Sequence, residues 1–118
     1  MNLKNRVKAF DTLGTILQNM ENKSLRSTFD SDRLSQETKK LNSLVKNLHQ
    51  QNGWFSPDFV SKALISLGKS LNREKLEKWV AGYNKDFEKF NTPKTVAVVM
   101  AGNVPAVGFH DFLSVLIS

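Results

Sequence analysis

The 118-residue sequence contains no cysteine, and it has only three prolines, six glycines and one tyrosine. The absence of cysteine excludes a disulfide framework, a thiolate nucleophile and a cysteine-ligated metal site within these residues. Few prolines and glycines, together with 40% hydrophobic and 24% charged residues, exclude a collagen-like or wholly disordered chain. The composition is that of a globular domain, and a chain of this length can fold on its own. The lack of cysteine also agrees with a cytoplasmic location, which we expect.

The sequence has no long uninterrupted apolar run. Charged residues recur between Lys4 and Asp11, where a secretory signal would need an apolar stretch. The most apolar segment, residues 95–118, is about as long as the ~20 residues that span a bilayer. Polar and turn-forming residues such as Gly102 and Pro105 interrupt this segment in its middle. We therefore expect no membrane span, and a buried strand–loop–helix in its place.

The net charge is positive, because 17 Lys and Arg residues outnumber 11 Asp and Glu residues and give a formal charge of +6. Such a charge favours anionic partners, among them nucleic acid, phosphate-bearing cofactors and acidic proteins. The basic residues are scattered, and Lys39 and Lys40 are the only adjacent pair. A generally solvated basic surface explains the charge equally well, and the two isolated histidines do not predict a metal site.

Residues 1–93 predict a helical region. Apolar residues recur there at steps of three and four, which is typical of amphipathic helices. Four segments show this spacing: about 3–20, 41–48, 57–67 and 72–83. Between the first two, residues 21–35 lose the periodicity and predict a polar linker.

Helix boundaries and aromatic residues refine this prediction. Ser56 and Asn72 are suitable N-caps, and Pro57 suits the first helical position. We expect helix ends at Asn52–Gly53 and at Gly68, and Gly14 costs the first helix little. The aromatic residues have helical spacing with Leu and Val, which favours packing in the core over stacking on nucleic acid. They are Trp54, Phe55, Trp79, Tyr83, Phe87 and Phe90, and the last two extend the fourth helix.

From Thr95 the pattern changes. Residues 95–100 form a continuous apolar run rich in β-branched residues, which is typical of a strand buried in a parallel sheet. A turn over 101–107 and helical spacing from Gly108 follow, so the segment predicts the first half of a βαβ unit. A parallel strand needs neighbours, and the chain has no second run of this kind. We therefore expect a mainly α chain in which 94–118 are the truncated start of a Rossmann-type α/β domain.

Residues 98–113 read VVMAGNVPAVGFHDFL. This string resembles the acyl-CoA reductase family, in which a strand ends in Ala-Gly-Asn-x-Pro and runs into Gly-Phe-His-Asp-Phe. The family includes the fatty-acid reductase of bacterial bioluminescence and belongs to the aldehyde dehydrogenase superfamily. Residues 52–57 and 76–83 are also similar to the family, less specifically. Before Asn52 the likeness is only a helical pattern.

The loop after the expected strand is the candidate site. In open α/β sheets ligands bind beyond the carboxyl ends of the strands, and small residues at Ala101 and Gly102 allow close approach to the backbone. Together with Met100 they are the expected cofactor-binding residues. The loop has no G-x-G-x-x-G fingerprint. His110 and Asp111 point about 100° apart on a helix, so we do not expect them to act as a dyad.

The resemblance implies a fold, an activity and a role for Asn103. It places Asn103 at the asparagine whose side-chain amide donates to the thiohemiacetal oxyanion. It implies reduction of a fatty acyl thioester, carried by CoA or by a protein, to the aldehyde with NADPH and a cysteine nucleophile. Because this sequence has no cysteine, we expect an inactive N-terminal part of the enzyme, with the nucleophile beyond Ser118.

Alternatives remain at the level of the sequence. Asn103 is also a common turn former, without any catalytic role. The whole chain can also be a stand-alone basic helical module that binds nucleic acid or an acidic protein. A third possibility is a scaffold fragment, and the unpaired apolar tail predicts that the fragment self-associates.

Overall fold

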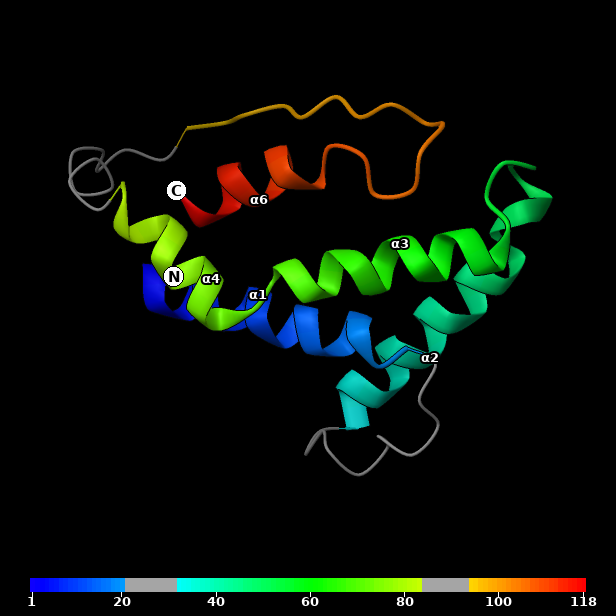
Figure 1. Cartoon of the computed structure of the whole chain (residues 1–118), viewed down its shortest axis with the longest axis horizontal. Helices are drawn as coiled ribbons and strands as arrows, with labels where there is room; N and C mark the ends of the chain where they lie inside the picture. The colour runs from blue at the N-terminus through cyan, green and yellow to red at the C-terminus, as the bar shows by residue number, and fades with distance from the viewer. Residues whose placement is uncertain (21–31, 84–93) are drawn as a thin grey trace.

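The computed structural model describes residues 1–20, 32–83 and 94–118, and over these residues the chain is mainly helical, as predicted (Figure 1). The elements are α1 (Leu3–Gln18), α2 (Asp32–Asn47), the 3-10 turn η2 (Leu48–Gln50), α3 (Pro57–Ser70), α4 (Arg73–Ala81) and α6 (Phe109–Ile117). Within the described ranges, no helix has both the length and the apolar character needed to cross a bilayer.

The predicted N-caps of α3 and α4 are confirmed. Ser56 Oγ accepts a hydrogen bond from the amide of Phe59 at 3.3 Å, and Pro57 is the first helical residue. Asn72 Oδ1 accepts from the amide of Glu74 at 3.0 Å. These bonds satisfy backbone donors that the first turn of a helix leaves without intrahelical partners.

Helices α1 and α3 form the closest helix pair, and they run in opposite directions (Figure 1). They meet at two glycines: a Cβ atom on Gly14 would lie 2.8 Å from the Leu71 carbonyl oxygen, and one on Gly68 would lie 2.8 Å from the Gly14 carbonyl oxygen. Gln18 Nε2 bridges the crossing by donating to the carbonyls of Gly14 at 3.2 Å and Gly68 at 3.0 Å. The sequence suggested that this helix ends at Gly68. Instead, α3 continues to Ser70, and Gly68 is the point of contact with α1.

The core lies where α1, α3, α4 and α6 meet. Leu71, between α3 and α4, and Ile117, in α6, are each only 1% exposed. Phe10 of α1 packs edge-to-face against Phe109 of α6, with ring centroids 6.4 Å apart. Arg6 Nη1 donates to the carbonyl of Ile117 at 3.3 Å, so both ends of α6 are attached to α1. The other buried apolar residues are Val7, Leu17, Met20, Val45, Val60, Leu76, Val80 and Leu113.

Helix α2 is longer than the sequence predicted. It begins at Asp32, inside the expected linker 21–35, and Val45 is its buried residue against the core. The rest of that linker, 21–31, lies outside the described residues, as do Phe87 and Phe90.

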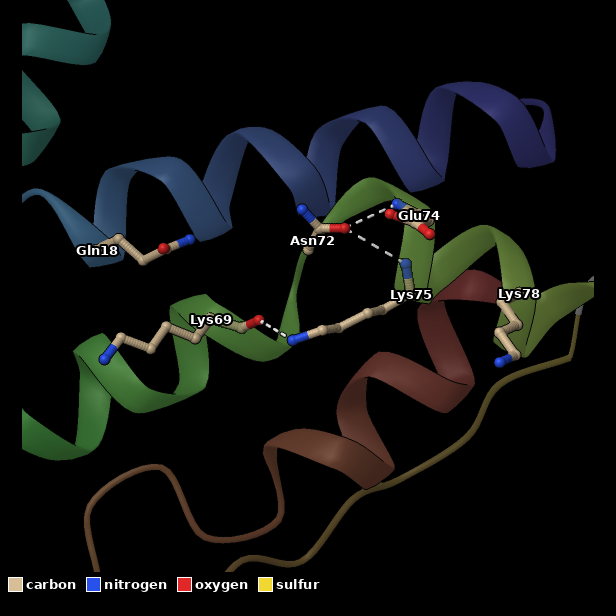
Figure 2. A pocket seen from close by; sticks show the side chains of 6 residues that line it. All are labelled: Gln18, Lys69, Asn72, Glu74, Lys75 and Lys78. Atoms are coloured by element: carbon tan, nitrogen blue, oxygen red, sulfur yellow. Dashed lines mark hydrogen bonds between the residues drawn. The ribbon is translucent and has the colours of Figure 1, made fainter.

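The strand expected over 95–100 is not formed. Residues 94–101 have no regular secondary structure, and α6 lies between this segment and α1 in both views (Figures 1 and 2). A strand requires a second extended segment as its hydrogen-bonding partner. The described residues contain no strand and provide no such partner, so the start of an α/β sheet is not seen.

Several aromatic residues expected in the core are at the surface. Trp54, in the turn before α3, is 80% exposed. Trp79 and Tyr83 are 38% and 52% exposed and pack edge-to-face on each other, with centroids 6.3 Å apart. Phe55 does pack against the core.

Candidate functional site

The loop that joins residues 94–101 to α6 turns through two residues of positive φ. Ala106 has φ 57° and Gly108 has φ 79°. The amide of Phe109 donates to the carbonyl of Ala106 at 3.1 Å, which closes the turn directly before α6. Positive φ is uncommon for a residue with a side chain, so Ala106 is a strained position in the candidate site loop.

Met100 packs back onto the end of this loop. A Cβ atom on Gly108 would lie 2.8 Å from Met100 Cγ, so the absence of a side chain at Gly108 is what lets Met100 lie there. Met100 is still 45% exposed. Of the three expected cofactor-binding residues, this is the one whose side chain the structure holds in place.

Asn103 lies at the bend of the loop and is exposed, as are Ala101 and Gly102. The carbonyl of Gly102 accepts a hydrogen bond from Asn52 Nδ2 at 3.1 Å. Asn52 is fixed in turn, because its Oδ1 accepts from the amide of Trp54 at 3.1 Å. The structure thus connects the Asn103 loop to the turn after η2.

Sequence reasoning missed this role of Asn52 and treated the residue only as a helix stop. The two partners are 50 positions apart, and a hydrogen bond between an asparagine and a backbone carbonyl leaves no periodic pattern in a sequence. Its only sign was that residues 52–57 and 98–113 both resemble the same family.

The remaining titratable candidates do not form a site. His110 and Asp111 are adjacent and exposed on α6, and the His110 carbonyl accepts from Ser114 Oγ at 2.7 Å. In the part of the chain that is described, no group of three or more His, Cys, Asp or Glu side chains is placed to hold a metal ion. The hydrogen bond to Glu77 raises the pKa of Arg73 above its ordinary value.

A second candidate region lies away from the loop, where α1, α3 and α4 surround a surface hollow of about 560 Å³ (Figure 2). The residues that line it are polar, and three of the six are lysines: Gln18, Lys69, Asn72, Glu74, Lys75 and Lys78. Lys75 Nζ crosses the hollow and donates to the carbonyl of Lys69 at 2.9 Å. These lysines do not stand out in the sequence, because they come from two helices and are not adjacent in the chain.

Comparisons of the chain with protein-family models, with curated proteins and with solved structures find no match. The resemblance to acyl-CoA reductases therefore depends only on the sequence motifs quoted above for it.

Proposed function

We propose that this chain is the N-terminal part of an acyl-CoA reductase that reduces a fatty acyl thioester to the aldehyde with NADPH, and that the chain alone is inactive. The observation that carries the proposal is the exposed apolar segment 95–100. Val96 and Val99 are 54% and 96% exposed, although β-branched runs of this kind are typical of buried parallel strands. Such exposure is expected of a strand that lacks its neighbours, and the Ala-Gly-Asn-x-Pro motif follows it directly.

In this proposal Asn103 is the oxyanion donor. Its side-chain amide would donate to the oxygen that becomes negative when a cysteine attacks the thioester. Donors on a rigid frame stabilise such charge best, because they need no reorganisation during the reaction. The hydrogen bond from Asn52 to the Gly102 carbonyl supports the backbone immediately before Asn103.

The loop residues fit a cofactor that approaches the backbone. A Cβ atom on Gly102 would meet nothing within 4 Å, so the space beside this residue is open. Ala101 adds only a methyl group, and Met100 contributes an apolar side chain held on Gly108. NADPH, when bound, supplies the hydride, and these residues would orient it. The nucleophile has to come from another part of the enzyme, because the chain contains no cysteine.

The test begins with the coding DNA beyond the codon for Ser118. The proposal expects an open frame that continues through strand–helix units to a cysteine. The encoded enzyme should oxidise NADPH in the presence of a long-chain acyl-CoA and release the aldehyde. A stop codon at this position, or aldehyde formation by the 118-residue chain alone, would contradict the proposal.

Asn103→Ala in that enzyme tests the oxyanion role. We expect kcat to fall by about two to three powers of ten, the usual effect of removing one oxyanion donor, with little change in KM. Asn47→Ala is the matched control, because Asn47 is exposed at the end of α2 and its side chain does not cap η2. Equal activity of the two variants would show that Asn103 only shapes the turn.

A further inference from the structure

The lysine-lined hollow between α1, α3 and α4 is not explained by the reductase proposal and does not depend on it. We propose that this hollow binds a small anion that carries phosphate groups, such as a phosphate monoester or a diphosphate. The argument starts from its lining, which contains three lysines and one glutamate.

The three lysines of the hollow form no ion pair with a carboxylate of the described residues. The ion pairs in the described ranges join Lys40 to Glu37, Lys62 to Asp58 and Arg73 to Glu77. None of them includes Lys69, Lys75 or Lys78, and no carboxylate of the described residues lies within 4.0 Å of these ammonium groups. The hollow therefore presents an excess of positive charge to solvent.

Lys75 is held in place for this role. Its ammonium group has three donors, and one of them is used by the Lys69 carbonyl at 2.9 Å. Its backbone amide lies 3.5 Å from Asn72 Oδ1, within the cap that starts α4. In Figure 2 the ammonium groups of Lys69 and Lys78 lie on opposite sides of that of Lys75. Two donors of the Lys75 ammonium group thus remain for an anion, with further positive charge on either side.

The chemistry of the lining selects the class of ligand. The side chains that line the hollow all carry a polar group, which disfavours a fatty acyl chain or an aromatic ring as its main occupant. Lysine ammonium groups act as point charges and bind phosphate oxygens without requiring a planar partner. A volume of about 560 Å³ is in the range of small-molecule sites. The lysines gather in one hollow, so a compact anion fits better than a nucleic acid strand.

The chain offers a reporter for binding. Trp79 follows Lys75 by one helical turn and therefore lies on the same side of α4. The other tryptophan, Trp54, is 80% exposed in a distant turn and can be replaced by Phe at little cost. In the Trp54→Phe background, titration with inorganic pyrophosphate should change Trp79 fluorescence saturably. We expect a Kd on the order of 0.1–1 mM at low salt, weakening as salt screens the exposed charges.

Two double variants separate a site from general electrostatic attraction. Lys75→Ala/Lys78→Ala removes two charges from the hollow, and Lys39→Ala/Lys46→Ala removes two from the exposed surface of α2, which packs on α3. We expect the first pair to weaken pyrophosphate binding about tenfold, since each exposed ion pair contributes roughly three- to fivefold. The control pair should change it less than twofold. Far-UV circular dichroism verifies that both double variants remain folded. If Lys75→Ala/Lys78→Ala does not fold, Lys75→Gln/Lys78→Gln replaces it.

Amide chemical shifts provide a second measurement, and pyrophosphate should move those of Lys69 and of residues 72–78 most. Equal weakening by the two double variants, or shifts spread over all the helices, would overturn the proposal in favour of diffuse attraction to the net charge. No saturable change up to tens of millimolar pyrophosphate would also overturn it. Tighter binding of a single-stranded oligonucleotide, weakened equally by both pairs, would point to a distributed nucleic-acid surface instead.

Discussion

The contact between α1 and α3 at Gly14 and Gly68 gives a sharp test of the packing. In Gly14→Ala the new Cβ atom would lie 2.8 Å from the Leu71 carbonyl oxygen, 2.9 Å from Leu71 Cβ and 3.0 Å from the Gly68 carbonyl oxygen. Two of these three atoms belong to the backbone and cannot move aside by a change of rotamer. The helices must therefore separate to accept a single methyl group.

Two effects of opposite sign decide how much Gly14→Ala changes the free energy of unfolding. Replacing a helical glycine by alanine stabilises a helix by about 1 kcal/mol. Overpacking a tight contact destabilises by roughly 1–3 kcal/mol, and separation of the helices also weakens the dispersion contacts along their seam. Because the neighbours are backbone atoms, we place the steric cost at the upper end, which leaves a net loss of about 1–2 kcal/mol. Gly68→Ala should behave similarly, since its Cβ would lie 2.8 Å from the Gly14 carbonyl oxygen.

Thermal unfolding followed by far-UV circular dichroism measures the effect. A loss of 1–2 kcal/mol corresponds to a decrease in Tm of roughly 4–16 °C for a domain of this size. Gly82→Ala is the control, because its Cβ would lie 3.5 Å from the Trp79 carbonyl oxygen and its φ of −65° suits alanine. The control should be as stable as the original chain or slightly more so. A Gly14→Ala variant that unfolds at or above the original Tm would refute the close contact between α1 and α3.

Two further predictions concern burial and exposure. Leu71→Ala should lower the free energy of unfolding by about 2–5 kcal/mol, because Leu71 is 1% exposed. Trp54→Ala should change the free energy of unfolding by about 0.5 kcal/mol or less, because Trp54 is 80% exposed. Similar losses in denaturant titrations of the two variants would contradict this arrangement of the core. Val99→Lys should reduce self-association of the chain in sedimentation velocity at several concentrations, because Val99 is 96% exposed on an apolar segment and a lysine there opposes pairing of edges. Ser43→Lys adds the same charge on the exposed surface of α2 and should leave self-association unchanged. An equal effect of the two variants would show that the net charge of the chain controls self-association.

Local signals predicted much of the helical part of this fold. Steps of three and four between apolar residues indicate which side of a helix is buried, and they need no knowledge of the partner. Ser56 and Asn72 act on amides two or three positions away, so their role as caps is readable from the sequence alone. The start of α2 was predicted too late, because Leu34 is the only apolar residue between positions 32 and 40 and one residue makes no apolar period.

Contacts between distant segments could not be predicted in the same way. Gly14 and Gly68 are ordinary helical glycines in the sequence, and only the crossing of α1 and α3 shows why a side chain is excluded at both. The bond from Asn52 to Gly102 and the position of Lys69, Lys75 and Lys78 around one hollow likewise join residues that are not neighbours in the sequence. Each depends on how the elements pack, which no local pattern specifies. Asn103 was singled out only through its family motif, and the structure adds its exposure and its support from Asn52.

The segment 95–100 shows why an apolar run predicts burial without identifying what buries it. Val and Met at these positions favour a strand covered on both faces, yet a strand exists only if another extended segment accepts its hydrogen bonds. The described helices cannot provide one, because their backbone donors and acceptors are already used within each helix. Pairing with a second copy of the chain and pairing with further polypeptide predict different behaviour. Self-pairing makes the exposure of Val99 depend on protein concentration, whereas a covalently attached sheet would keep Val99 protected at every dilution.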